Sequence, residues 1–338
     1  MSVVHITEER VKELLDWPLV CDAVEQALRA ICANRTSDEQ PISQQPIRNF
    51  TPTEKGVLLC MPGFIGKYKL AGSTKVFNTL GCKLVSSFIA NRFLNPPKPN
   101  IMANIFLFSE ETGQLNAVIG ADDLTAWQTA AASMVATKYL YSKRPSTPAI
   151  NTVAILGCGV EGRIHAIGFC TTNFVDSIYL WNRTISRAEA LVTELKQLRH
   201  SFKNPNVQII CGESVADCVK NADVIVTATY ADTPFLYRSM IKDNVHINAT
   251  GAGEKGHHSE LAEDIYTDPE SKIYVDTKAG ARIEFHLKAP IVCEIGDIIN
   301  GHNSTPTAGI TIFHSMGLGV EDAACGQAIL EKFRKKLN

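Results

Sequence analysis

A glycine-rich turn between an apolar run and a helix-like stretch is the feature that most constrains this 338-residue chain. The segment TVAILGCGVEG ends in Gly157, Gly159 and Gly162, which have the spacing G-x-G-x-x-G. In a strand–turn–helix unit the first glycine permits the tight turn and the second lets the backbone approach a pyrophosphate. The third lets helix and strand pack closely, and the N–H groups at the helix start face the anion. The segment therefore predicts a dinucleotide site.

The residues after the next strand-like run, SIYLW, indicate which dinucleotide binds. In the NAD pattern an acidic residue near this point accepts a hydrogen bond from the ribose 2′-OH. This chain instead has Asn182, Arg183 and Thr184. Arg183 can pair with a 2′-phosphate, and its two neighbours can donate to it, so we predict NADPH as the cofactor. The alternative is a solvated loop in which Thr184 or Ser186 caps the next helix, a role compatible with phosphate binding.

Strand-like and helix-like runs alternate through the middle of the chain. This alternation predicts an α/β fold with a doubly wound, mostly parallel Rossmann sheet, whose ligands lie at the carboxyl ends of the strands. The expected strands are residues 152–156, 177–181, 207–211, 223–229, 245–250 and 272–276.

The two flanking pieces have a mixed pattern that predicts an α+β domain. Helical spacing over residues 8–16 and 17–33 precedes several strand-like runs, and an alanine-rich helix is expected over 122–140. A third piece, from Thr305 to Asn338, ends in an amphipathic helix that we expect to pack back on the first piece. The expected strands are residues 46–51, 56–64, 70–77, 101–109 and 114–120, the last two as a hairpin.

Composition excludes several classes of protein. The net charge of −2 and the absence of a basic stripe argue against a nucleic-acid-binding protein. Because no apolar run reaches about 18 residues and the first residues do not resemble a signal peptide, we predict no membrane association. Ten cysteines without metal-ligand spacing are typical of reduced thiols in a cytoplasmic protein. The adjacent His257 and His258 point apart, so no metal site is expected.

Several segments together resemble one family. QPIRNF, STKVF, ETGQLNAVIGADDLTAWQTAAAS, AILGCGVEG, LWNRT and TIFHSMGLGVEDAACG, in this order, are similar to the ornithine cyclodeaminase/mu-crystallin family, and most similar to its NADPH-dependent ketimine reductases of the mu-crystallin type. The resemblance implies a homodimer that acts on a small imine. It also implies that residues 123–317 form the NADP-binding Rossmann domain, inserted into a substrate-binding and dimerisation domain of residues 1–122 plus 318–338.

The resemblance assigns roles to individual residues. Arg48 matches the arginine that binds the substrate carboxylate, and Lys75 matches a lysine able to orient or protonate an imine nitrogen. Thr129 matches a threonine at the nicotinamide end of the cofactor. Ser315 is expected either near the nicotinamide or as a helix cap. The loops that follow two strands, residues 228–229 and 250–253, are expected either to contact the cofactor or to be ordinary turns. The remaining residues predicted at the cofactor are Val160, Glu161, Ala228, Thr229, Thr250 and Gly251.

Two departures from the family bear on the substrate. Gln128 stands where the family usually has a second carboxylate-binding arginine. If Gln128 has a catalytic role, its amide can donate a hydrogen bond to the substrate but adds no positive charge. In the loop after Thr250, Gly253 occupies the position of the aspartate of ornithine cyclodeaminases. Glu254 or His257 can take over proton transfer there, or both are solvated loop residues. Cyclodeamination of ornithine is therefore not expected.

These observations predict an NADPH-dependent reductase that transfers hydride to the C=N group of a small imine or cyclic ketimine carboxylate. One alternative is a protein that retains NADPH but only binds a small ligand, such as a thyroid-hormone-like aromatic acid. Another is an NAD(P)-dependent amino-acid dehydrogenase or a lyase similar to ornithine cyclodeaminase.

Overall fold

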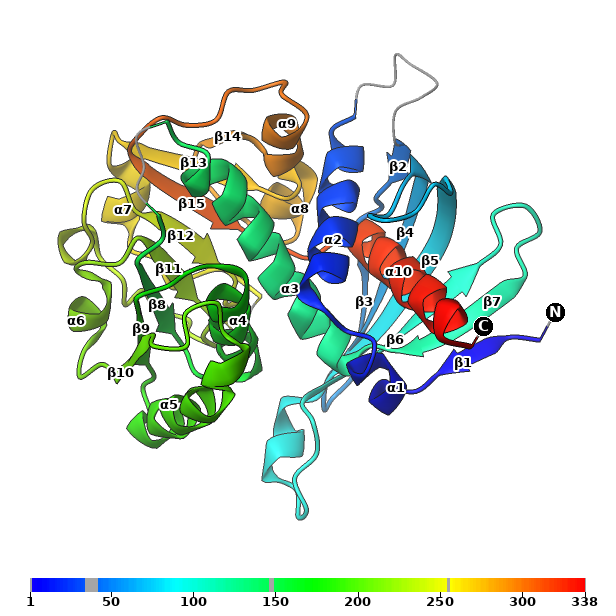
Figure 1. Ribbon diagram of the computed structural model, residues 1–338, viewed down its shortest axis with the longest axis horizontal. Helices are drawn as coiled ribbons and strands as arrows, with labels where there is room; N and C mark the ends of the chain where they lie inside the picture. Colours follow the sequence, from blue (N-terminus) through cyan, green and yellow to red (C-terminus); the bar gives the residue numbers. More distant parts are fainter. Residues whose placement is uncertain (1, 34–41, 146–148, 254–255, 338) are drawn as a thin grey trace. The chain divides into compact units, whose positions relative to one another are not determined.

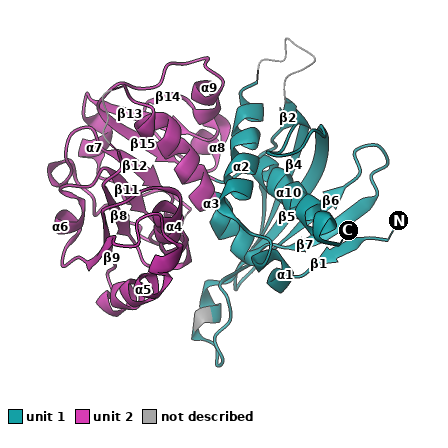
Figure 2. Ribbon diagram, in the orientation of Figure 1, with its two compact units in different colours: residues 1–128, 317–338 teal, residues 129–316 magenta. Residues whose placement is uncertain are grey.

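The chain forms two compact units in the computed structural model (Figure 2). The structure describes residues 2–33, 42–145, 149–253 and 256–337. Unit 1 consists of residues 1–128 and 317–338, and unit 2 consists of residues 129–316. The sequence places the corresponding boundaries after residue 122 and before residue 318.

Unit 2 is built on an eight-stranded sheet in which every neighbouring pair of strands is parallel (Figure 1). Its first five strands have the spatial order 3-2-1-4-5 of a Rossmann fold, which confirms the predicted fold class, and the sixth place is taken by the last strand of the unit in sequence. In spatial order the strands are β10 (Gln208–Cys211), β9 (Ser177–Trp181), β8 (Thr152–Leu156), β11 (Val224–Thr227), β12 (His246–Ala249), β15 (Ile310–His314), β13 (Ser271–Val275) and β14 (Ile291–Glu294).

The central strands of this sheet are buried on both faces. Every residue of β11, β12 and β15 is buried, as expected for a parallel sheet covered by helices on both sides. The helices of this unit are α4 (Val160–Thr172), α5 (Ile185–Leu198), η3 (Arg199–Ser201), α6 (Val215–Val219), η4 (Arg238–Met240), α7 (Glu263–Thr267), α8 (Lys278–Ile283) and α9 (Ile295–Ile299).

Unit 1 contains a seven-stranded sheet. Its first strand in sequence pairs in parallel with the last one, and all other pairs are antiparallel. The strand order is β1-β7-β6-β5-β4-β2, and β3 also pairs with β4. The strands are β1 (Val4–Ile6), β2 (Ile42–Gln44), β3 (Asn49–Pro52), β4 (Val57–Tyr68), β5 (Phe77–Ser87), β6 (Ile101–Phe108) and β7 (Leu115–Gly120).

One face of this sheet is covered by α2 (Trp17–Ile31) and α10 (Gly319–Leu337) (Figure 1). From Phe77 to Val85, strand β5 alternates between buried residues and more exposed ones, because every second side chain points toward the helices. The other helices that begin in this unit are α1 (Glu8–Lys12), η1 (Ile89–Phe93) and α3 (Asp122–Thr137), which the π-helix η2 (Lys138–Ser142) continues in unit 2.

The structure corrects one predicted strand. Residues 70–76 do not form a strand, because Gly72 has a positive φ of 71° in a turn closed by the Ser73 N–H bond to Leu70 O. The strand starts only at Phe77. As predicted, the terminal helix α10 packs on the sheet of unit 1, whereas β15 joins the sheet of unit 2.

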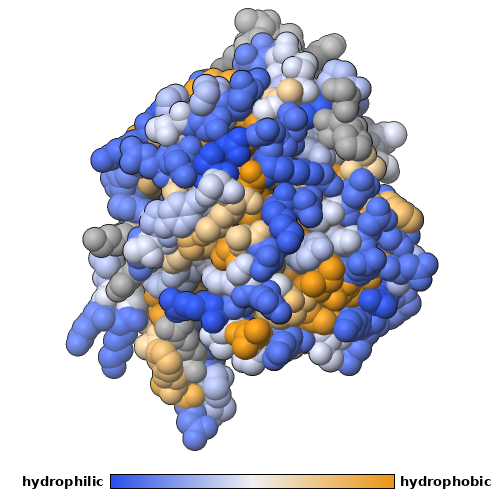
Figure 3. Space-filling model, turned by 90° about the vertical axis from the view of Figure 1, so that its left-hand side faces the viewer, coloured by the Kyte–Doolittle hydropathy of each residue, from blue (hydrophilic) through white to orange (hydrophobic). Residues whose placement is uncertain are grey.

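Among the described helices, none combines the length and the apolar character that a membrane span requires. On the face seen in Figure 3, hydrophobic side chains occur in patches among hydrophilic ones.

Candidate functional site

The glycine turn between β8 and α4 has a backbone that only glycine permits. Gly157 has φ +110°, and its N–H donates to Trp181 O over 2.8 Å. A Cβ on Gly157 would lie 2.4 Å from Ala228 O, and one on Gly162 would lie 1.7 Å from Gly157 O. These two glycines therefore hold strand, turn and helix together within unit 2.

Gly159 differs from its two partners. An ideal Cβ at this position meets no atom within 4 Å, so the space in front of it is open. Gly159 is the N-cap of α4 and brings no side chain to the first turn, and Val160 is 67% exposed. The first N–H groups of a helix have no partner within the helix, so this end fits the pyrophosphate of a dinucleotide.

The segment after β9 borders this turn. Asn182 Oδ1 accepts from the Cys158 N–H over 3.1 Å, and Asn182 Nδ2 donates to Thr184 O over 2.9 Å. Thr184 is the N-cap of α5, as predicted, but its side chain makes no capping hydrogen bond. Arg183 is exposed. Asn182 thus fixes the loop, and the Arg183 guanidinium is presented on the surface beside it.

Glu260 ties together the ends of β11 and β12. One of its carboxylate oxygens accepts from the N–H and the hydroxyl of Thr229, over 2.7 and 2.6 Å, and the other accepts from the Gly251 N–H over 3.2 Å. Burial raises the pKa of this carboxyl, and these hydrogen bonds partly oppose the shift. Glu260 therefore positions two of the predicted cofactor residues, a role that the sequence does not reveal.

The other predicted cofactor residues lie mostly at the carboxyl ends of neighbouring strands. The N–H groups of Ala228 and Thr250 continue the ladders by donating to Leu156 O and Thr227 O, over 2.8 and 2.9 Å. Ser315 is buried just after β15, and Glu161 lies in the first turn of α4. Thr129 is half-buried in α3.

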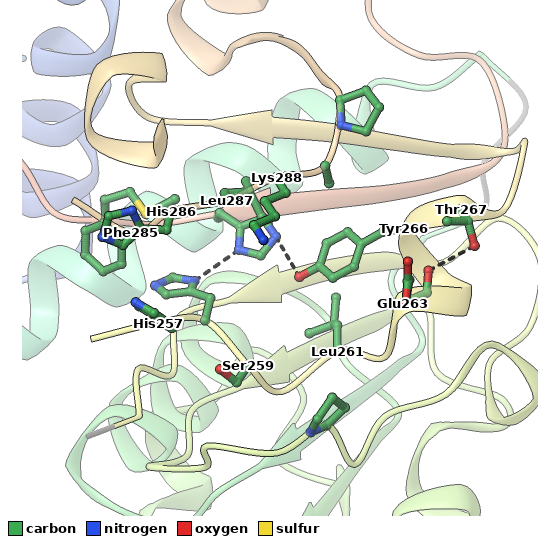
Figure 4. Close-up of a pocket in the computed structure, with 16 residues that line it drawn as sticks. His257, Ser259, Leu261, Glu263, Tyr266, Thr267, Phe285, His286, Leu287 and Lys288 are labelled. Atoms are coloured by element: carbon green, nitrogen blue, oxygen red, sulfur yellow. Dashed lines mark hydrogen bonds between the residues drawn. The ribbon is translucent and has the colours of Figure 1, made fainter. Parts of the chain in front are cut away.

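A pocket of about 630 Å³ opens in unit 2 at the end of β15 (Figure 4). Its walls come from the segments after β12 and α8, with His257, Tyr266 and Phe285 among the lining side chains. His314 Nε2 lies 3.2 Å from the Tyr266 hydroxyl, and His314 Nδ1 lies 3.0 Å from His258 Nδ1. Glu254, the other candidate of this loop, lies outside the described residues.

His314, which lies between Tyr266 and His258 in this series of contacts, is neutral. Burial lowers the pKa of His314 well below its ordinary value, and His258 beside it acts in the same direction. A neutral imidazole has one donor and one acceptor nitrogen, so a donor on one side of His314 requires an acceptor on the other. The arrangement can relay a proton between Tyr266 and His258.

In unit 1 a buried ion pair joins β5 to the first turn of α10. Lys83 Nζ lies 2.8 Å from Asp322 Oδ1, and both side chains are less than 10% exposed. Burial raises the pKa of Asp322, whereas Lys83, Arg48 and Gln128 act to lower it. These four residues therefore form one cluster, which we call the α10 cluster.

Arg48 and Gln128 of this cluster also contact the backbone around α10. Arg48 Nη2 donates to Gly317 O over 2.8 Å, and Gln128 Nε2 donates to Glu321 O over 3.2 Å. The structure thus brings together two of the three residues predicted for catalysis.

The third predicted residue, Lys75, lies apart from them. Its side chain is 60% exposed, and Lys75 Nζ lies 3.5 Å from Glu331 Oε1. Asp322 and Glu331 are nine positions apart on α10, or about 13 Å along the helix axis. The lysine that joins Arg48 and Gln128 is Lys83.

Close packing of the helix on the sheet creates the α10 cluster. A Cβ on Gly319 would lie 2.3 Å from Pro62 O, and one on Gly63 would lie 2.3 Å from the Gly319 carbonyl carbon. Because both residues lack a side chain, the helix start approaches β4 closely, and Asp322 in its first turn reaches Lys83.

The sequence does not identify Lys83 or Asp322 as site residues. The strand predicted over residues 70–77 ends where β5 begins, so no predicted strand carries Lys83, whereas β5 runs from Phe77 to Ser87. The signal was present in the alternation of Thr79, Gly81, Lys83 and Val85, which places a lysine on a buried face.

The geometry of unit 2 defines a dinucleotide-binding protein of the Rossmann class. More specifically, the chain belongs to the ornithine cyclodeaminase/mu-crystallin family, whose model matches residues 2–337.

Relatives and solved structures cover most of the chain. It is 28% identical over 312 residues to the ketimine reductase mu-crystallin of Rattus norvegicus, a match that covers 90% of each protein. An archaeal alanine dehydrogenase dimer with bound NAD has a TM-score of 0.82 at 24% identity and covers 100% of this chain and 98% of its own. The Delta(1)-pyrroline-2-carboxylate reductase of Thermococcus litoralis, in complex with NADH and L-proline, has a TM-score of 0.81 at 24% identity, with 99% and 98% covered. These two structures share the fold.

Proposed function

We propose that this protein is an NADPH-dependent reductase that transfers hydride to the C=N carbon of a small cyclic imine. The α10 cluster is the observation that carries the proposal, because it brings a buried ammonium and a buried amide together with the half-buried guanidinium of Arg48. The names of several relatives support the same enzyme class, since they include a ketimine reductase, a Delta(1)-pyrroline-2-carboxylate reductase and an alanine dehydrogenase, whereas others are named cyclodeaminases.

The residues of unit 2 fit a nicotinamide dinucleotide. Gly159 and the start of α4 would hold the pyrophosphate, and Arg183 would pair with the 2′-phosphate of NADP. Thr229 and Gly251, both held by Glu260, would line the nicotinamide end. When bound, the reduced cofactor supplies the hydride.

The residues of unit 1 would bind the substrate and manage its proton. Lys83 takes the role predicted for Lys75, which is to donate a proton to the nitrogen as the carbon is reduced. Asp322 holds the Lys83 ammonium in place. Arg48, fixed to Gly317 O, orients a polar group of the substrate.

We also propose a homodimer, in which a second copy covers the open face of the unit 1 sheet. This face is opposite α2 and α10, and an archaeal relative of the same fold is a dimer. Light scattering should give the mass of two chains, and Leu58→Glu, a change at an exposed position of this face, should shift it toward one. A monomeric wild-type protein would contradict the proposal. The apolar side chains of the open face include Leu58, Cys60, Phe64, Leu80, Cys82, Leu84, Met102, Phe106 and Phe108.

The direct test is to follow NADPH oxidation by absorbance with a panel of cyclic imines, including five- and six-membered rings and sulfur-containing ketimines. The proposal predicts turnover with at least one of them. Tight NADPH binding without turnover on any imine would instead favour a protein that only binds a small ligand.

A further inference from the structure

The α10 cluster has little capacity for an additional negative charge. Within the cluster Arg48 and Lys83 carry two positive charges and Asp322 one negative charge, and the buried neighbour Glu321 on α10 adds a second negative charge, so the formal charges of this region cancel. Glu321 is 3% exposed and accepts from the Leu318 N–H over 3.2 Å, and Asp322 is 1% exposed. A substrate carboxylate would therefore lie among side chains whose net charge is zero, so no excess positive charge would balance it.

The orientation of the Gln128 amide is set by its surroundings. The peptide oxygen of Glu321 can only accept, so the Gln128 nitrogen must face it, at 3.2 Å. Hydrogen bonds from Gln128 also lower the pKa of the Asp322 carboxyl and of the Cys325 thiol. The nitrogen side of the amide thus faces acceptors.

The oxygen side of the same amide is unsatisfied. Gln128 is 3% exposed, and its Oε1 is buried without a hydrogen-bond partner among the described residues. A buried acceptor of this kind is costly unless a ligand supplies a donor. A carboxylate has no proton to donate and would repel this oxygen, whereas a neutral amide or hydroxyl group can donate to it.

We propose that the substrate is a neutral imine that carries an N–H or O–H donor, such as a carboxamide, in place of a carboxylate. Gln128 is then the specificity-determining residue, with Oε1 accepting from that donor while Arg48 donates to the carbonyl of the same group. This inference rests on the proposed function, because it names the substrate class of that site.

The test compares two substrates that differ only in this group. We expect the full-length enzyme with saturating NADPH to reduce 1-piperideine-2-carboxamide with a kcat/KM about tenfold or more above that for 1-piperideine-2-carboxylate. Gln128→Arg, which adds a charge, should reverse the preference, and Gln128→Leu, which removes only the acceptor, should abolish it. A wild-type preference for the carboxylate, or an unchanged ratio in both variants, would overturn the inference.

Binding of the saturated compounds separates this inference from the proposed function. Calorimetry on the NADP-loaded protein should show piperidine-2-carboxamide binding about tenfold or more tighter than piperidine-2-carboxylate. If that holds while neither imine is reduced, the proposed reductase activity fails and the specificity of Gln128 stands. Equal binding, or tighter binding of the carboxylate, contradicts the role of Gln128 whether or not the imines are reduced.

Discussion

The Lys83 ammonium lies 2.8 Å from the Asp322 carboxylate, in a part of unit 1 where both side chains are buried. If Lys83 protonates the substrate nitrogen, its removal should lower kcat/KM for imine reduction by about a hundredfold or more. Lys83→Met alone would leave a buried carboxylate unpaired, so we would combine it with Asp322→Asn, which restores neutrality. Steady-state kinetics checks the effect, and thermal unfolding confirms that the double variant is folded.

Lys75 provides the matched control. Because its side chain is exposed and contacts Glu331, we expect Lys75→Met to change kcat/KM by less than about threefold. A large loss in this variant together with an active Lys83 double variant would return the catalytic role to Lys75.

Alanine substitutions at two glycines of the turn should have different effects, one on the stability of the fold and the other on NADPH binding. A methyl group on Gly162 collides with the backbone of the turn, so Gly162→Ala should destabilise the protein by about 3 kcal/mol or more. Gly159→Ala meets open space and should change stability by less than about 0.5 kcal/mol, yet weaken NADPH binding about tenfold or more. Urea unfolding and NADPH fluorescence titration measure the two effects. Normal NADPH affinity in Gly159→Ala would mean that the pyrophosphate lies elsewhere.

Arg183 should determine the choice between the two nicotinamide cofactors. Its guanidinium is exposed beside the fixed loop of Asn182, where it would meet the 2′-phosphate. Arg183→Ala should raise the Kd of NADPH about tenfold, as expected for loss of a charged hydrogen bond, and leave the Kd of NADH unchanged. An equal loss of affinity for NADPH and NADH would show that Arg183 does not bind the 2′-phosphate.

Buried histidines should make the protein sensitive to acid. Burial lowers the pKa of His165 to about 4 and that of His246 to about 3, whereas an unfolded histidine titrates near 6.5. Between these values the unfolded chain binds protons that the folded chain excludes, so stability falls as the pH decreases from about 6.5 to about 4. Each histidine contributes about 1.4 kcal/mol per pH unit in that range. Urea unfolding at several pH values measures the slope.

His165→Gln tests this origin of the acid sensitivity. In the folded protein His165 Nδ1 donates to Glu161 O over 2.7 Å, and Ser133 lies 2.9 Å from Nε2, so glutamine can replace much of the bonding. The slope of stability against pH should decrease by about 1.4 kcal/mol per unit. An unchanged slope would mean that His165 is not protonated on unfolding.

The sequence predicted unit 2 better than unit 1. A parallel sheet depends on local strand–turn–helix repeats, and Gly157, Gly159 and Gly162 mark the central one directly. The α10 cluster instead depends on contacts between distant parts of the chain. Lys83 and Asp322 are 239 positions apart, and they meet because the helix start packs closely on β4 at Gly63. No local sequence pattern indicates that the start of α10 approaches β4 so closely.

The central claim is direct hydride transfer from NADPH to an imine carbon. The most direct measurement is reduction of a cyclic imine with NADPH that carries deuterium at the transferable position of the nicotinamide, followed by mass spectrometry of the amine. We predict one deuterium at the former C=N carbon of the product, and slower formation of the same labelled amine in the Lys83→Met, Asp322→Asn variant. An unlabelled amine, or no amine at all from any imine, would contradict the account.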